Sequence, residues 1–263
     1  MPHHLMDILN PGEAFSVAQY VQLAGQAIRE VADCGHLPFL VGGTGLYIQA
    51  LVDGMQFQED SEDPAIRQKW LDYAAAHGNE ALHQQLRQVD PLLAEKLHPN
   101  NVGRVVRALE VCEVTGRPMS QVQAQARREN SPYDLLMIGL DYRERARLYE
   151  RINLRVDQML EQGLLQEAER ISSHLSHTAA QAIGYKELFP YFAGEVPLEQ
   201  AVEDIKRESR RYAKRQITWF AREENAVPLY LDELDGPEGL LEATVRVLEE
   251  KGFGSPARKE ECL

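Results

Sequence analysis

The sequence predicts an α/β fold: a parallel sheet core into which an all-helical segment is inserted. A short apolar run at 38–41 stops at a glycine-rich segment, 42–45, where a new helix begins. Two more apolar runs, 135–140 and 227–231, have the length of buried strands. Helix, buried strand and glycine turn in succession are typical of parallel α/β sheets. We therefore expect a core of residues 1–53 and 132–252, a helical insertion at 54–131, and a flexible tail at 253–263.

The helices are predicted from apolar side chains that recur every three or four residues. The first spans 15–34, where Ser16 is placed to cap the start and Gly35 to end it. Glycine and proline divide the insertion into helices at 64–77, 80–89, 91–97, 103–115 and 120–128. After the second strand we expect helices at 144–162, 163–175, 180–192 and 197–223.

The composition is that of an ordinary globular protein, with 263 residues of which 44% are hydrophobic and 26% charged. No apolar stretch approaches the roughly 20 residues of a membrane helix, and the first residues lack the pattern of a signal peptide. Three cysteines lie far apart without a C-x-x-C, which predicts neither a disulfide framework nor a cysteine zinc site. We therefore expect a cytoplasmic protein without a membrane partner.

Positive charge is concentrated in parts of the chain, although the formal net charge is −13. Arginine and lysine gather at 104–128, 143–155 and 203–222, whereas acidic residues lie mostly elsewhere. The three basic segments could together bind a polyanion. They could equally be three ordinary solvated helix faces.

The glycine-rich segment 42–45 is a candidate anion site, because a strand is expected to end there and a helix to begin. Glycines would let a ligand approach the backbone, and Thr44 adds a hydroxyl at the same point. A structural tight turn explains the same residues. No G-x-x-x-x-G-K-[ST] pattern occurs in the sequence, so a self-contained nucleotide hydrolase is not expected.

Two arginines lie near the start of the helix expected at 103–115. Arg104 and Arg107 are three residues apart and so share a face of that helix. Arginines near a helix start can hold phosphate, and they can equally pair with Glu110 or Glu113.

Arg145 and Arg151 are candidate diphosphate ligands, because guanidinium groups bind phosphate oxygens in pairs. Arg145 lies at the start of the helix that follows the second strand, and Arg151 lies well inside it. The alternative is a surface helix with Glu144 and Glu150 as counter-ions.

The most unusual segment is 209–220, where cations fall near one helical face with Gln216 and Trp219 among them. Cations beside amide and aromatic groups suit RNA, whose phosphates are held while unstacked bases rest on rings. The alternative is an amphipathic helix with Tyr212 and Trp219 in the core.

Together these motifs resemble the tRNA dimethylallyltransferase family, also called tRNA isopentenyltransferases. The resemblance follows the family's order across residues 2–222, and its joint signal is specific although each stretch alone is weak. The matching stretches are P-H-H-L-M-D-I at 2–8, V-G-G-T-G-L-Y at 41–47, D-P at 90–91 with the run at 98–111, T-G-R-P at 115–118, R-L-Y-E-R-I at 147–152, A-I-G-Y-K-E at 182–187 and A-K-R-Q-I-T-W-F at 213–220.

The resemblance implies transfer of a dimethylallyl group from dimethylallyl diphosphate to N6 of adenosine 37, beside the anticodon of tRNA. It also implies a P-loop-kinase-like core and a helical insertion that embraces the anticodon stem-loop. We expect a monomer. The adenine amine needs a general base, and the departing diphosphate needs Mg²⁺ and arginines to meet its charge. The target base must also leave its stack.

The resemblance assigns roles to residues as well. Thr44, Arg145 and Arg151 would be catalytic, with the two arginines on the diphosphate. The residues that would contact tRNA are Thr44, Gly103, Arg104, Arg107, Gly184, Tyr185, Lys186, Lys214, Arg215, Gln216 and Trp219. Mg²⁺ is the expected cofactor, and the sequence identifies no ligand for it.

The sequence departs from the family pattern at its start. Family members carry a phosphate-binding P-loop, and then an Asp-Ser segment whose aspartate is taken as the general base, ahead of Pro-His-His-Leu. This sequence begins at Met1-Pro2-His3-His4, so we expect an N-terminally truncated core. The alternative function is a catalytically inactive homologue that only binds the anticodon stem-loop. A transferase acting on free adenine nucleotide fits the large basic insertion less well.

Overall fold

The computed structural model of the chain describes residues 2–55, 63–126, 131–176, 178–223 and 225–253. It divides into two compact units, one formed by Met1–Leu51 with Tyr133–Leu263 and the other by Val52–Pro132. These boundaries lie next to those expected from the sequence. Most of the expected flexible tail, residues 254–263, lies outside the described residues. Every helix in the described part is too short or too polar to span a lipid bilayer.

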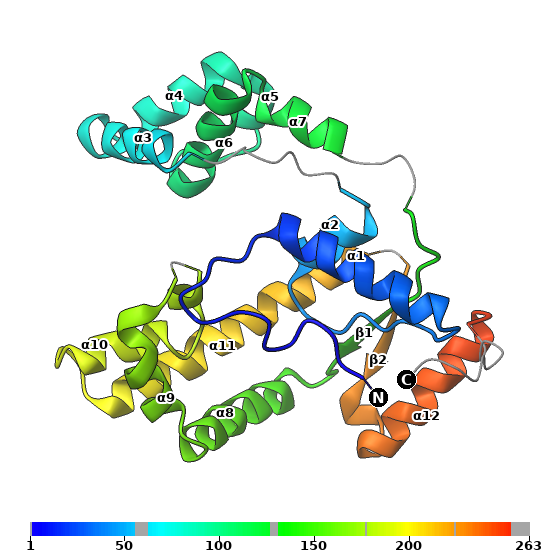
Figure 1. The fold of residues 1–263 in the computed structure, drawn as a ribbon. Coiled ribbons are helices and arrows are strands. Elements are labelled where there is room, and N and C mark those ends of the chain that lie inside the picture. Colours follow the sequence, from blue (N-terminus) through cyan, green and yellow to red (C-terminus); the bar gives the residue numbers. More distant parts are fainter. Residues whose placement is uncertain (1, 56–62, 127–130, 177, 224, 254–263) are drawn as a thin grey trace. The chain divides into compact units, whose positions relative to one another are not determined.

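The first unit contains a parallel sheet, which confirms the α/β class (Figure 1). Strands β1 (Met137–Asp141) and β2 (Ala226–Tyr230) pair in parallel, with Ile138 opposite Val227. Because the strands are parallel, their carboxyl ends meet at one edge, which is where ligands bind in open α/β sheets. The helix α8 (Arg145–Glu161) begins beyond that end of β1.

The expectation of a strand at 38–41 is wrong, since these described residues form none. Residues 37–43 make no backbone–backbone hydrogen bond in this part of the chain, and Val41 is 90% exposed. A short apolar run forms a strand only where a neighbouring strand pairs with its N–H and C=O groups. Neither β1 nor β2 does so, and the run leads without regular structure into α2 (Gly45–Val52).

The helix α1 (Val17–Asp33) confirms the first expected helix and its start. The Ser16 hydroxyl accepts the N–H of Gln19, and the Gln19 side chain accepts the N–H of Ser16. This reciprocal capping box satisfies two N–H groups that the helix itself leaves unpaired. The ring centroids of Tyr20 and Tyr47 lie 4.9 Å apart, so α1 packs against α2.

Four further helices of the first unit surround an apolar core. They are α8, α9 (Leu164–Ile171), α10 (Phe189–Phe192) and α11 (Leu198–Phe220), and Figure 1 shows α8 and α11 side by side. The core comprises Val156, Leu164, Ala168, Leu188, Ala201 and Ile205. After β2 come the short turn η4 (Leu231–Glu233) and the helix α12 (Gly236–Glu250), which the sequence analysis did not predict.

A continuous helix at 180–192 is the second wrong expectation. The segment instead forms the 3₁₀ turns η2 (Ala179–Gln181) and η3 (Lys186–Leu188) before α10, and η1 (Ser172–His174) precedes them. Gly184 between η2 and η3 has a φ of 107°, which a right-handed helix cannot contain.

The second unit is helical, as predicted, throughout its regular described elements. Its helices are α3 (Pro64–His77), α4 (Asn79–Val89), α5 (Pro91–Ala94), α6 (Val102–Thr115) and α7 (Met119–Ala126). They enclose a core of Leu82, Leu86, Ala94, Val105, Val106, Ala108 and Leu109. Gly78 and Gly116 end helices with positive φ values of 86° and 68°, the conformation that favours glycine.

Candidate functional site

The glycine-rich loop at 42–45 lies directly against α11. The side-chain amide of Gln216 donates to the carbonyl oxygen of Gly43 over 3.0 Å. The hydroxyl oxygens of Thr44 and Tyr212 are 3.4 Å apart. The carbonyl of Thr44 accepts the N–H groups of Tyr47 and Ile48, which starts α2. The structure thus brings together two sequence motifs that are far apart along the chain.

Close approach by α11 side chains explains why glycine occupies positions 43 and 45. A Cβ atom at Gly43 would lie 1.9 Å from Nε2 of Gln216, and one at Gly45 would lie 2.4 Å from the Trp219 ring. Neither glycine has a positive φ, so backbone conformation alone does not require glycine there. The Gln216 amide and the Trp219 ring fill the space beside the two glycines, where a ligand was expected from the sequence.

The cations along α11 differ in whether a carboxylate pairs with them. In the first half, Lys206 pairs with Asp157 and Arg207 with Asp204. In the second half, Arg211 pairs with Glu208, whereas Lys214 and Arg215 have no carboxylate partner in the described part of the chain. Arg222, just beyond the end of α11, has none there either, and the Arg215 guanidinium lies 5.5 Å from the Tyr212 ring centroid. An open cavity of about 440 Å³ is lined by Arg211, Lys214, Arg215, Thr218, Trp219 and Arg222.

A second open cavity, of about 600 Å³, lies at the carboxyl edge of the sheet. Its lining residues are Tyr142, Arg147, Glu150, Arg151, Leu154, Leu231, Asp232 and Leu234. The Arg151 guanidinium lies 5.9 Å from the Tyr142 ring centroid and has no carboxylate partner among the described residues. Arg147, which also lines the cavity, pairs with Glu144 at 2.8 Å.

Arg145, the other expected diphosphate ligand, is held by the last residue of β1. Its Nη1 and Nη2 atoms bind the two carboxylate oxygens of Asp141 at 2.6 and 3.2 Å. Arg145 is absent from the residues that line the cavity. The two arginines that the sequence analysis treated alike therefore have different surroundings.

Asp232 is a residue of this site that the sequence analysis missed. Its carboxylate accepts the N–H groups of Glu144 at 2.8 Å and Arg143 at 3.0 Å, at the start of α8. These hydrogen bonds, the one from Glu144 first, hold the pKa of Asp232 below its ordinary value. A side-chain carboxylate thus occupies a helix N-terminus that could otherwise bind phosphate. Nothing near Asp232 in the sequence marks this contact, which depends on the β1–β2 pairing.

The expected Mg²⁺ has few protein oxygens available at this edge. No three His, Cys, Asp or Glu side chains come together in the described part of the chain. The Asp232 carboxylate already accepts two N–H groups, whereas Glu150 in the same cavity has no described hydrogen-bond or ion-pair partner. Mg²⁺ commonly takes one or two carboxylates and completes its shell with water and substrate phosphates. The residues present fit an ion of that kind rather than a full protein cage.

The turn at Gly184, Tyr185 and Lys186 is held by carboxylates. The N–H of buried Gly184 donates to Glu187 at 2.9 Å. The Tyr185 hydroxyl donates to Glu167, and burial together with this carboxylate raises the pKa of Tyr185 to about 12. Lys186 is exposed.

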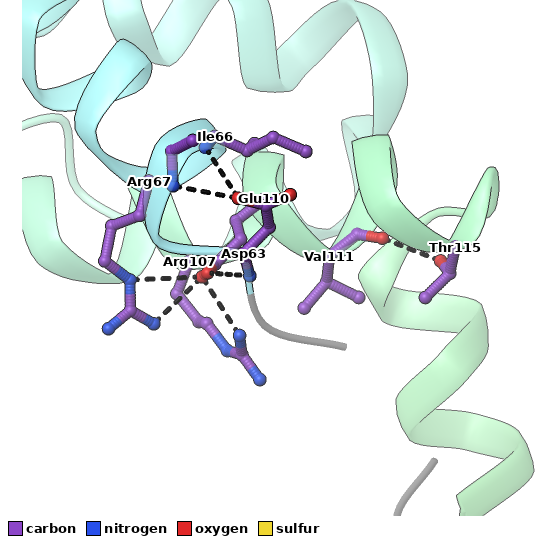
Figure 2. Close-up of polar contacts among 8 residues, drawn as sticks. Asp63, Ile66, Arg67, Arg107, Glu110, Val111 and Thr115 are labelled. Atoms are coloured by element: carbon purple, nitrogen blue, oxygen red, sulfur yellow. Dashed lines mark hydrogen bonds and ion pairs between the residues drawn. The ribbon is translucent and has the colours of Figure 1, made fainter. Parts of the chain in front are cut away.

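In the helical unit, the two arginines of α6 differ as the pair in α8 does. Arg107 binds the buried carboxylate of Glu110 at 2.9 Å, as does Arg67, and the N–H of Asp63 donates to the same carboxylate (Figure 2). Burial opposes ionisation of Glu110, but these donors outweigh it and hold its pKa below the ordinary value. Arg104 is exposed and has no described partner.

The remaining expectations in this helix have simple outcomes. Gly103 is exposed, and a Cβ atom there would meet nothing within 4 Å. Glu113 pairs with Lys69 rather than with an arginine of α6.

Within the first unit, the structure brings Thr44 and Arg215 to the same side chain, Tyr212. No contact among the described residues joins Arg151 to either of them. The diphosphate candidate and the α11 cations are therefore two neighbouring features of one unit, each with its own open cavity.

The comparisons with known proteins agree with one another. The sequence model described as IPP transferase matches residues 1–223. A tRNA dimethylallyltransferase of Moorella thermoacetica is 47% identical over 225 residues, which cover 85% of this chain and 69% of that protein. One of Shouchella clausii is 44% identical over 254 residues, covering 96% of this chain and 81% of that protein.

Solved structures are similar as well. The full-length tRNA isopentenylpyrophosphate transferase of Bacillus halodurans matches with a TM-score of 0.65 and 42% identity, over 96% of this chain and 80% of that chain. A eukaryotic dimethylallyltransferase, described as acting on tRNA, matches with a TM-score of 0.75 and 26% identity, over 99% of this chain and 68% of that chain.

Proposed function

The chain belongs to the IPP transferase family, and from this membership we propose that it transfers a dimethylallyl group from dimethylallyl diphosphate to N6 of adenosine 37 in tRNA. In this reaction N6 attacks the allyl carbon and loses one proton to water or to the departing diphosphate. The bond from that carbon to the diphosphate oxygen breaks, and the diphosphate leaves with the electron pair. The protein must therefore meet negative charge as it develops.

The structural observation that carries the proposal is the guanidinium of Arg151, which is unpaired among the described residues. It lines the cavity at the carboxyl edge of the parallel sheet and has no carboxylate partner in the described part of the chain. Its donors are thus open to an anion, and a guanidinium can bind two phosphate oxygens at once. Arg145, which Asp141 already holds, is assigned the smaller part in binding the diphosphate.

We assign Mg²⁺ to the diphosphate rather than to a site made by the protein alone. Glu150 is the candidate protein ligand, because it lines the same cavity as Arg151 and has no described partner. The ion would supply charge neutralisation for the leaving group.

The tRNA is assigned to the exposed cations that no carboxylate neutralises. These are Lys214 and Arg215 on α11 and Arg222 just beyond its end, which line one cavity. In the helical unit Arg104, beside exposed Gly103, is the corresponding candidate. Phosphate contacts of this kind position the nucleic acid, and the anticodon stem-loop is the part that carries adenosine 37.

The test is a prenylation assay with the purified chain, dimethylallyl diphosphate, Mg²⁺ and unmodified tRNA that carries adenosine 37. We expect N6-dimethylallyladenosine in the digested tRNA, detected by mass spectrometry, and none with tRNA whose position 37 is guanosine. If no product forms while the chain still retards tRNA in a gel, the chain binds tRNA without modifying it, and the catalytic proposal is wrong.

A further inference from the structure

We propose that Gln216 and Trp219 are positioning residues, which fix the loop at 42–45 and thereby place Thr44 for the transfer reaction, rather than contacts to tRNA. The inference rests on the proposed function, since it assigns Thr44 to the same reaction. It changes the role of two residues that lie between tRNA-binding candidates in the sequence.

The directions of neighbouring side chains on α11 support this division. Lys214 and Arg215 are exposed, whereas Gln216 and Trp219 are half-buried against the loop. Tyr212, Gln216 and Trp219 follow at intervals of four and three residues, so they lie along one face of the helix. That face contacts Thr44, Gly43 and Gly45 in turn.

The loop depends on these contacts because it has little else to hold it. Residues 37–43 make no backbone–backbone hydrogen bond within the described part of the chain. The carbonyl of Gly43 is instead bound by the side-chain amide of Gln216 at 3.0 Å. A loop without a backbone ladder takes its position from the side chains that bind and pack on it.

Steric fit gives a second, independent reason. The space at Gly43 is filled by the amide of Gln216, and the space at Gly45 is filled by the Trp219 ring, so even a methyl group would collide at either position. Two glycines and two larger side chains therefore form one matched set. Residues that mainly contacted tRNA would not need glycine opposite them.

Thr44 lies between these two contacts and is itself exposed. Its carbonyl accepts the N–H groups of Tyr47 and Ile48, so the loop position also sets the start of α2. A displacement of about 1 Å in a reacting geometry can lower the rate of an enzyme about 100-fold. Release of the loop is therefore expected to affect turnover more than tRNA affinity.

The test is a double-mutant cycle of Gly43→Ala and Gln216→Ala in the full chain, with Gln200→Ala as the control. Gln200 lies on the same helix, and its side-chain amide donates to Asp204. We expect Gln216→Ala to lower kcat about 10-fold or more while tRNA Kd stays within about 2-fold. Gly43→Ala should be worse, and Gln216→Ala should suppress part of its defect, because it removes the atom with which the new Cβ collides.

Hydrogen exchange of the Tyr47 and Ile48 amides in the chain without tRNA provides a readout independent of activity. Gln216→Ala should speed their exchange about 5-fold, whereas Gln200→Ala should not. If the wild type fails to prenylate tRNA but exchange still responds to Gln216→Ala, the proposed function fails and the positioning of the loop stands. If exchange is unchanged, or if Gln216→Ala weakens tRNA binding as much as Lys214→Ala at constant kcat, the positioning proposal is overturned.

Discussion

Two arginine-bearing helices of this protein, α6 and α11, place their cations in different surroundings. On α6, Arg107 pairs with the carboxylate of Glu110. This side chain is only 1% exposed and also pairs with Arg67. On the second half of α11, Lys214 and Arg215 border an open cavity without a described carboxylate partner.

The difference teaches that position on a helix does not identify a ligand-binding cation. Arg107 satisfies a buried charge that would otherwise destabilise the helical unit, because an unpaired buried carboxylate is costly. Lys214 and Arg215 of α11 neutralise no described carboxylate, so their charge is available to an external polyanion. The same contrast separates Arg145 from Arg151 within α8.

The largest expected effect is on Arg151. Arg151→Ala should lower kcat/KM for dimethylallyl diphosphate about 100-fold to 1000-fold, since a single donor to developing charge is commonly worth that much. Arg145→Ala should lower it about 10-fold or less, because Asp141 already occupies two of its donors. Steady-state kinetics of both variants measure this difference. Equal losses of kcat/KM would show that pairing with Asp141 does not reduce the part of Arg145 in binding the diphosphate.

The next effect is on the stability of the helical unit. Glu110→Gln should lower its free energy of unfolding by about 2–3 kcal/mol, because two arginines and the N–H of Asp63 lose a buried carboxylate. Glu113→Gln on the same helix is the matched control. Its partner Lys69 is more than half exposed, so the loss should be below about 1 kcal/mol. Denaturant-dependent hydrogen exchange of the α6 amides measures both, and similar values would remove the distinction between the two carboxylates.

A smaller effect is expected from pH. The pKa of Glu110 in the folded protein is held below its ordinary value of 4.5, so its stabilisation is complete above pH 4.5 and is lost as the pH falls through the folded pKa. The difference in stability between the wild type and Glu110→Gln should therefore shrink on acidification below pH 4.5. A difference that stays constant from pH 6 to pH 3 would contradict the assigned role of the carboxylate.

Much of the fold could be predicted from periodicity, and the two wrong expectations have different causes. The helices of the insertion, the cap at Ser16 and two strands were predictable from local patterns. The run at 38–41 was not, because strand formation depends on a partner that no local pattern supplies. The segment at 180–192 looked helical, but Gly184 adopts a φ that ends a helix.

The candidate site residues could be selected from the sequence, but their contacts could not. Sequence alone selected Arg104, Arg107, Arg145 and Arg151, yet it could not say which of them a carboxylate would neutralise. Asp141 pairs with Arg145 only four residues along the chain, whereas Asp232 acts through a tertiary contact at the start of α8. The pairing of Gly43 with Gln216 joins residues 173 positions apart, so no motif could reveal it.

The central claim is that cations without a carboxylate partner bind an external anion, which on α11 is tRNA, and that paired cations do not. The most direct test is the salt dependence of tRNA binding for Arg215→Ala and Arg207→Ala, two arginines of α11 of which only Arg207 pairs with an aspartate. We predict that Arg215→Ala lowers the slope of log K against log salt by about 0.7 to 0.9, whereas Arg207→Ala leaves it unchanged. Equal slopes for the two variants would contradict the account.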